Sequence, residues 1–169
     1  SSMPNAILEG GSYVINCTPW YQQTPPRQVC DVEVKLRDME DMETDISVLS
    51  HGIPGPELLG GADADYWASR INDHIASVVD DYPGKFIGMG SIGFGDPDRS
   101  IAEIDRCIHE LGFKGIQIFS NTQQKVSDLP EFLPVYRHIS SLGVPMNMHP
   151  TAPINYTGID SLPLVNGIG

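Results

Sequence analysis

Residues 144–150 carry a histidine, His149, at the end of a segment whose pattern predicts a buried strand. Side chains alternate along a strand, so His149 shares one face with Asn147. The opposite face is wholly apolar and consists of Val144, Met146 and Met148. In barrels of parallel strands, metal-binding and reacting side chains lie at the C-terminal ends of the strands. We therefore expect His149 and Asn147 to face a polar lumen and the apolar residues to face a helix layer. The alternative is a histidine that bonds only neighbouring backbone.

The three cysteines, Cys17, Cys30 and Cys107, have neither the CxxC spacing nor the nearby histidines of a zinc site. We interpret them as reduced packing residues and not as nucleophiles. A bridge between Cys17 and Cys30 is the alternative, since both lie in the irregular N-terminal region.

Composition limits the functions that the chain can have. With 169 residues and 40% hydrophobic content, it can bury one sizeable core. Its 22 acidic and 10 basic residues leave a net charge of -12, which repels nucleic acid and anionic membranes. No apolar run approaches the ~20 residues that cross a bilayer, and residues 1–5 lack the pattern of a signal peptide. These features predict a soluble, cytoplasmic protein.

The periodicity of apolar residues switches repeatedly between that of a helix and that of a strand. Gly112 and Gly143 follow two of the apolar helical stripes, and Asp96 with Pro97 begins one of them. The expected helices are Asp31–Glu43, Asp63–Tyr82, Pro97–Leu111 and Pro134–Leu142, and the expected strands are Ile46–Ser50, Phe86–Ile92, Gly115–Phe119 and Val144–His149.

This alternation predicts an α/β fold with a parallel sheet and right-handed crossovers. The last three strands begin roughly 30 residues apart, and eight such units would need about 240 residues, the length of a (β/α)8 TIM barrel. The chain therefore holds only about four β/α units, strands 2 to 5 of such a barrel. An open doubly wound sheet is the alternative, but the Gly-rich run 88–93 lies along a strand and opens no helix.

Several segments resemble the amidohydrolase-related metal-dependent decarboxylases of the aminocarboxymuconate-semialdehyde decarboxylase type. The similar stretches, in order, are Lys35–Met42 leading into Ile46–Ser50, Asn72–Ala76, Tyr82–Gly88, Glu110–Ile118 and Met148–Pro150. The resemblance implies a TIM barrel whose metal, zinc or a similar divalent ion, is held by an HxH pair, a fifth-strand histidine and an eighth-strand aspartate. It further implies that a histidine on the sixth strand handles protons.

On this resemblance, His149 matches the fifth-strand metal ligand. The chain contains no HxH pair, and its other histidines, His51, His74, His109 and His138, match no catalytic position. Because a metal that activates water needs about three protein ligands, the chain alone is not expected to form a competent site.

The N-terminal region is expected to form a hairpin and a lid-like insertion, residues 1–30, ahead of the partial barrel, residues 31–169. In the resembling enzymes such an insertion covers the mouth, which makes Tyr13 and Trp20 candidate substrate-binding residues. Polar residues near the C-terminal strand ends are further candidates: Ser50, His51, Ser91, Ser120, Asn121 and Asn147. Val14 and Leu164 replace a substrate-binding arginine and a tryptophan of the decarboxylase type, so a different acid is expected.

Two hypotheses follow for the function. The first is a metal-dependent carboxy-lyase, or a hydrolase of the same superfamily, that acts on a small unsaturated or aromatic carboxylate. The second is a non-catalytic half-barrel that acts as an interaction module, with its exposed sheet edges covered by a second copy in a homo-oligomer.

Overall fold

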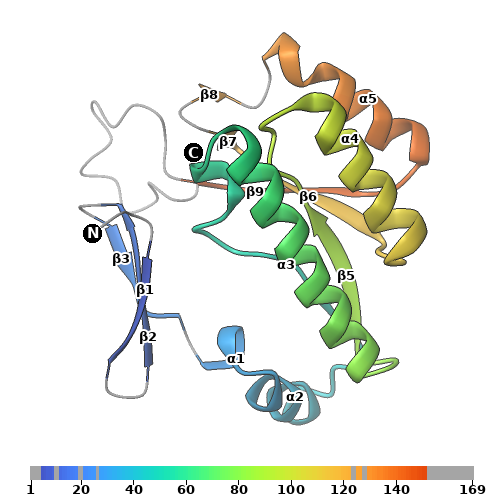
Figure 1. Ribbon diagram of the computed structural model, residues 1–169. Coiled ribbons are helices and arrows are strands. Elements are labelled where there is room, and N and C mark those ends of the chain that lie inside the picture. Colours follow the sequence, from blue (N-terminus) through green and yellow to red (C-terminus); the bar gives the residue numbers. More distant parts are fainter. Residues whose placement is uncertain are drawn as a thin grey trace. The chain divides into compact units, whose positions relative to one another are not determined.

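A computed structural model describes residues 5–9, 12–18, 21–25, 27–122, 125–126 and 129–151 (Figure 1). The chain divides into two compact units, residues 1–47 and residues 48–169, and each is described by itself.

The first unit begins with an antiparallel sheet. Strand β1 (Asn5–Glu9) pairs with β2 (Ser12–Thr18), Leu8 lies opposite Tyr13, and β3 (Tyr21–Gln23) pairs with β2. The expected hairpin is thus confirmed.

Two helices complete this unit, α1 (Arg27–Cys30) and α2 (Val32–Asp41). The Asp31 carboxylate accepts from the Val34 N–H at 3.2 Å, so this residue precedes the helix as its N-cap. The expected helix Asp31–Glu43 is therefore present with slightly shorter bounds.

The second unit contains a four-stranded sheet in the order β4 (Ser47–Leu49), β5 (Phe86–Ser91), β6 (Gly115–Phe119) and β9 (Met146–His149). Strand β5 is parallel to β6, and β6 is parallel to β9. The spatial order follows the chain order, as in one arc of a barrel, whereas a doubly wound sheet reverses direction at a switch point. The expected α/β half-barrel is confirmed.

The crossovers are helical. They contain α3 (Gly61–Asp81), α4 (Pro97–Asp105) with a π-helical continuation, η2 (Arg106–Glu110), and α5 (Leu133–Leu142). Shorter elements are η1 (Pro56–Leu58), β7 (Asn121–Thr122), β8 (Lys125–Val126) and η3 (Pro130–Phe132).

The ends of these helices follow the sequence signals. The Asp96 carboxylate accepts from the Arg99 N–H at 2.9 Å, Pro97 is the first residue of α4, and Gly143 ends α5 in the left-handed region with φ 66°. The stripe that predicts one helix up to Leu111 is instead α4 followed by the wider π turn.

The hydrophobic core lies between the sheet and the three long helices of this unit, which run along the strands in Figure 1. It includes Ile75 of α3, Ile104 of α4 and Val135 of α5, packed with Ile116 and Ile118 of β6. Because side chains alternate, Gln117 and Phe119 of the same strand project to the opposite face, which corresponds to the barrel lumen.

The glycines that follow β5 bring the chain against α3. A Cβ on Gly93 would lie 2.6 Å from the Ala64 backbone carbon, and one on Gly95 would lie 2.2 Å from the Gly61 carbonyl oxygen. Only glycine fits at these two positions, so the loop after β5 packs directly on the first turns of α3.

The apolar face of β9 differs from its expected environment. Met146 pairs with Ile116, and Met148 pairs with Ile118, so both methionines lie on the helix side of the sheet. However, they are 45% and 53% exposed, because no described helix covers the edge formed by β9. The prediction that they pack under a helix layer is wrong for the part of the chain that the structure describes.

Candidate active site at the barrel rim

His149 is the last residue of β9 and lies on the lumen face. It pairs in register with Phe119, and their rings are 5.6 Å apart between centroids. The ring Nδ1 lies 2.7 Å from the Pro150 carbonyl oxygen. Since a carbonyl only accepts, Nδ1 carries a proton, so in the neutral ring Nε2 holds the lone pair that a metal ligand requires. The histidine does bond neighbouring backbone, the Pro150 carbonyl, and that bond leaves Nε2 open.

A chain of hydrogen bonds crosses the lumen face below His149. Asn147 Nδ2 donates to Gln117 Oε1 at 3.1 Å, and Gln117 Nε2 donates to the carbonyl oxygen of His51. These contacts join β9, β6 and the segment that follows β4. Gln117 is almost completely buried, so the row is a fixed floor beneath the rim.

His51 stands at the same rim, two residues after β4. Its Nε2 lies 2.8 Å from the Pro54 carbonyl oxygen. Burial lowers the pKa of His51, and the neighbouring His149 lowers it further, while the Pro54 contact opposes both effects. The imidazole is therefore neutral near pH 7.

Glu57 in η1 is an acidic residue in a buried position. Its side chain is 3% exposed; Oε1 accepts from the Gly55 N–H at 3.0 Å, and Oε2 has no hydrogen-bond partner among the described residues. Burial raises the pKa of Glu57 to about 7. The loop between β4 and α3 thus holds a carboxyl group that is partly protonated at neutral pH.

The C-terminal ends of β6 and β9 are tied together by short polar side chains. Asn121 Nδ2 donates to Thr151 Oγ1 at 2.6 Å, the Thr151 N–H donates to Ser120 Oγ at 3.0 Å, and the Ser120 N–H donates to the His149 carbonyl at 3.0 Å. These bonds hold the backbone that carries His149.

Ser91 ends β5 on the lumen face, in register with Gln117. A Cβ on the preceding Gly90 would meet Cys107 Sγ in the core at 2.7 Å, so the Ser91 side chain points to the other face. Its hydroxyl is buried and has no hydrogen-bond partner among the described residues. Ser91 therefore lies in the floor of the site, not on its open surface.

The main chain of Ser91 is held by Asn72, a fully buried residue of α3. Asn72 Oδ1 accepts from the Ser91 N–H at 2.7 Å, and Nδ2 donates to the Ser91 carbonyl at 2.9 Å and to Glu103 Oε1 at 2.7 Å. Because a carboxylate cannot donate, the contact with Glu103 fixes the orientation of the amide.

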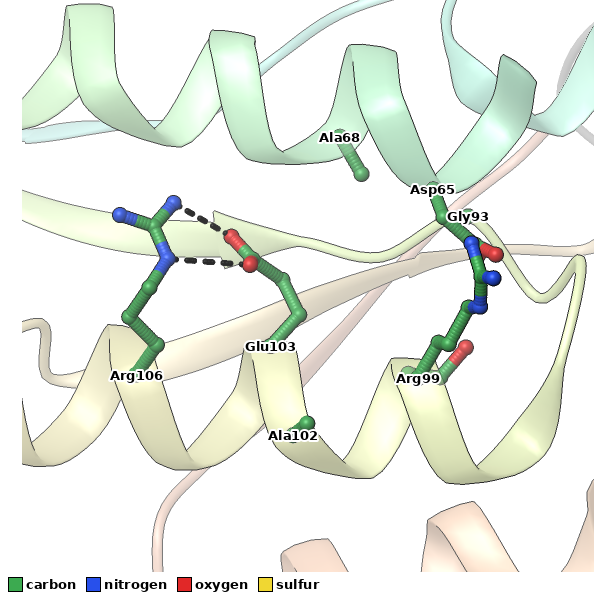
Figure 2. Close-up of a pocket in the computed structure, with 8 residues that line it drawn as sticks. Asp65, Ala68, Gly93, Arg99, Ala102, Glu103 and Arg106 are labelled. Atoms are coloured by element: carbon green, nitrogen blue, oxygen red, sulfur yellow. Dashed lines mark hydrogen bonds and ion pairs between the residues drawn. The ribbon is translucent and has the colours of Figure 1, made fainter. Parts of the chain in front are cut away.

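A polar network and a cavity lie between α3 and α4, in the helix layer. Arg106 donates to Glu103 at 2.7 and 3.0 Å and to Asp73 at 2.8 Å. Figure 2 shows the cavity beside Glu103 and Arg106, with Asp65 and Arg99 at its other end. The volume of the cavity is about 260 Å³. Its lining contains none of the predicted site residues, and we assign it a structural role.

Two predicted substrate-binding residues cannot be placed in a site. Trp20 lies outside the described residues, and for Tyr13 only the backbone position in β2 is described. Of the remaining histidines, His74, His109 and His138 lie in α3, η2 and α5, as expected.

Of the cysteines, Cys107 is a free thiol. It is buried, and burial raises its pKa, which makes it an inert packing residue. The side chains of Cys17 and Cys30 lie outside the described residues.

The described residues fit one position of a metal site and do not complete it. His149 has an open nitrogen, but no group of three or more His, Cys, Asp or Glu side chains in the described ranges is arranged to hold an ion.

Three residues of this region were not predicted as site residues: Gln117, Glu57 and Thr151. Gln117 is in the site through a hydrogen bond to His51, which is distant in sequence, and Glu57 is a buried acid. The local sequence pattern reveals neither property. The sequence indicated Thr151 only weakly as a site residue, through its place directly after the His149-Pro150 pair.

Known proteins are similar to this chain in sequence and in fold. The chain is 37% identical over 129 residues to a 2-amino-3-carboxymuconate-6-semialdehyde decarboxylase of Dictyostelium discoideum, covering 71% of the chain and 34% of that protein. It is 31% identical over 168 residues to a gamma-resorcylate decarboxylase of Rhodococcus jostii, covering 91% and 49% respectively. The chain thus spans between a third and a half of the length of these curated relatives.

A solved structure extends the likeness to the fold. The 5-carboxyvanillate decarboxylase of Novosphingobium aromaticivorans, complexed with manganese and 4-hydroxy-3-methoxy-5-nitrobenzoic acid, superposes with a TM-score of 0.69 at 38% identity. The match covers 79% of this chain and 38% of that one. None of the described helices of this chain combines the length and apolarity that crossing a membrane requires.

The sequence pattern of the Amidohydrolase family matches residues 37–166, which include all four strands of this sheet and the rim histidine. The chain belongs to the amidohydrolase family.

Proposed function

We propose that the protein carrying this chain is a metal-dependent decarboxylase that acts on a small unsaturated or aromatic carboxylate. The observation that carries the proposal is His149, which ends a parallel strand on the lumen face with Nε2 left open by the Pro150 contact. The relatives named above support the reaction class, since each is a decarboxylase by name.

We infer that His149 is one ligand of a divalent ion and that Asn147 lies beside the bound substrate. A bound ion would supply Lewis acidity and a fixed positive charge next to the substrate carboxylate. Asn147 donates to Gln117, and no described residue donates a hydrogen bond to its amide oxygen, which leaves that oxygen available to a substrate hydroxyl. We further propose zinc as the ion, although the solved relative holds manganese. Tyr13 and Trp20 remain proposed substrate contacts.

The residues of this chain would chiefly orient the substrate. Rigid donors and acceptors that are positioned before the reaction stabilise a transition state without reorganising. The Asn147-Gln117 row and the Ser120-Thr151 contacts provide such rigidity, because they join neighbouring strands at the rim.

The decisive experiment measures metal and activity together. The protein is purified with whatever sequence flanks it in the natural gene, its zinc and manganese are quantified, and carbon dioxide release is assayed on hydroxylated aromatic acids. We expect about one ion per chain, and we expect His149→Ala to lower both metal content and kcat/KM by at least about 100-fold.

Met148→Leu is the matched control, because the neighbouring residue lies on the opposite face of β9 and should leave both quantities unchanged. A wild-type protein with less than a tenth of an ion per chain and no carbon dioxide release would refute the proposal. Conversion of the same acids without carbon dioxide release would favour a hydrolase or hydratase.

A further inference from the structure

A second histidine, His51, lies at the rim, and a hydrogen bond defines the tautomer of its ring. Its main-chain oxygen accepts from Gln117, which is in register with Asn147 on the lumen face, and the Pro54 carbonyl holds its ring through Nε2. His51 therefore lies at the same rim of the sheet as the proposed metal ligand. The sequence motifs of the family resemblance assign it no role.

The tautomer of His51 follows from one contact. Nε2 lies 2.8 Å from the Pro54 carbonyl oxygen, which can only accept, so Nε2 carries the proton. In the neutral ring the second nitrogen, Nδ1, then carries a lone pair. Among the described residues no donor reaches Nδ1, so this acceptor is available to a ligand.

The position of the ring is fixed by its surroundings. A Cβ on Gly55 would lie 2.7 Å from Cδ2 and 2.9 Å from Nε2 of His51, so the imidazole fits against the backbone only because residue 55 is glycine. The same Cβ would lie 2.6 Å from Glu57 Oε2, which places this carboxyl group on the same side of the loop. Glu57 also holds the loop through the Gly55 N–H.

The chemistry of a neutral imidazole acceptor selects its partner. A lone pair binds a hydroxyl or N–H donor and gives no favourable contact to a carboxylate oxygen. A site built to accept a hydrogen bond discriminates against an analogue that lacks the donor, because the acceptor would lose its bond with water and gain none.

From this arrangement we propose that His51 is a specificity-determining residue that accepts a hydrogen bond from a hydroxyl group of the acid substrate. The proposal rests on the proposed function and deepens it, since it assigns the recognition of a substrate hydroxyl group to one residue. Pro54, Gly55 and Glu57 act as positioning residues that hold the ring.

The test compares ligands that differ by one hydroxyl group. Dissociation constants of benzoate and of 2-, 3- and 4-hydroxybenzoate are measured by calorimetry at pH 7 on the metal-loaded protein and its variants. In the wild type we expect at least one hydroxybenzoate to bind about tenfold more tightly than benzoate. His51→Ala should lower this ratio to near one by weakening the hydroxybenzoate alone, and His51→Gln, which keeps an acceptor, should retain most of it.

The matched control is His74→Ala, on an exposed position of α3, which should change neither constant. If His51→Ala does not fold, as judged by circular dichroism, His51→Leu replaces it as an acceptor-free variant of similar volume. Equal weakening of benzoate and hydroxybenzoate, or an unchanged ratio, would overturn the inference.

Carbon dioxide release in the same samples separates the two proposals. A wild type that discriminates through His51 but releases no carbon dioxide refutes decarboxylation and supports the role of His51. A wild type that decarboxylates while His51→Ala keeps the full ratio supports the proposed function and refutes the inference. A wild type that neither discriminates nor decarboxylates refutes both.

Discussion

At the residue scale, the most unusual group is the buried carboxyl of Glu57. Acidic residues are rarely buried without a charged partner, because removing the charge from water costs free energy. Its pKa is raised to about 7 from the usual 4.5, so the folded state binds a proton more tightly than the unfolded chain does. The resulting stability is present below pH 4.5 and is lost as the pH rises through 7.

We therefore expect the free energy of unfolding of the wild type to fall by about 3 kcal/mol between pH 4.5 and pH 8, from this group alone. Glu57→Gln should lack this part of the dependence and should be more stable than the wild type at pH 8. Urea unfolding at a series of pH values measures the effect, with Glu110→Gln at an exposed position as control. Parallel curves for wild type and Glu57→Gln would show that the carboxyl is solvated in solution.

The burial of Glu57 could not be predicted from the sequence around it. Glu57 lies in a loop rich in proline and glycine, where a charged residue predicts a solvent-exposed turn. The position of His149 could be predicted, since the alternation of side chains along its strand fixes its face of the sheet and Pro150 marks the end of the strand.

At the element scale, Asn72 connects a helix to a strand of the sheet. The N–H and C=O of one strand residue point to the same side, so the Asn72 amide stands where a neighbouring strand would otherwise bond Ser91. The Glu103 and Arg106 side chains extend this contact to α4.

Asn72→Ala would leave the Ser91 backbone groups unsatisfied and remove one donor to Glu103, so we expect a loss of about 3 kcal/mol in the free energy of unfolding. His74→Ala, two residues along α3 and exposed, should cost less than about 0.5 kcal/mol. Thermal and urea unfolding would compare the two variants. Equal losses would mean that the α3-β5 contact contributes no more than an exposed side chain.

The elements themselves were largely predictable from apolar periodicity and from caps. The segment Gly115–Phe119 is the expected strand, and Asp96 with Pro97 begins the expected helix. The π turn at Arg106–Glu110 was not predicted. Its first residue, Arg106, makes long-range contacts with Ser69 and Asp73 on α3, which a local pattern does not reveal.

At the scale of the whole molecule, the sheet in the described residues is an open arc and not a closed barrel. Met146 and Met148 of the edge strand β9 are about half exposed. They lie on the face of the sheet that the other strands bury in the hydrophobic core. An uncovered apolar edge of this kind is a surface that proteins normally pair or cover.

In the 169-residue chain, hydrogen peroxide should oxidise Met146, Met148 and the 75% exposed Met42 well before Met39, which is 6% exposed. Peptide mass spectrometry over a time course measures the order. Protection of Met146 and Met148 alongside rapid oxidation of Met42 would contradict the open edge and would favour a second copy of the chain covering it.

The tight packing of Gly93 and Gly95 on α3 has a consequence for how this rim can evolve. A side chain at either position would push the helix away, so the segment after β5 tolerates little variation in length or sequence. In the segment between β4 and α3, Gly55 packs only on the side chains of His51 and Glu57 in the same segment, and a Cβ on Gly52 would have no atom within 4 Å. New substrate preferences in this lineage would therefore arise mainly by changes there, while the neighbouring loop stays a fixed wall.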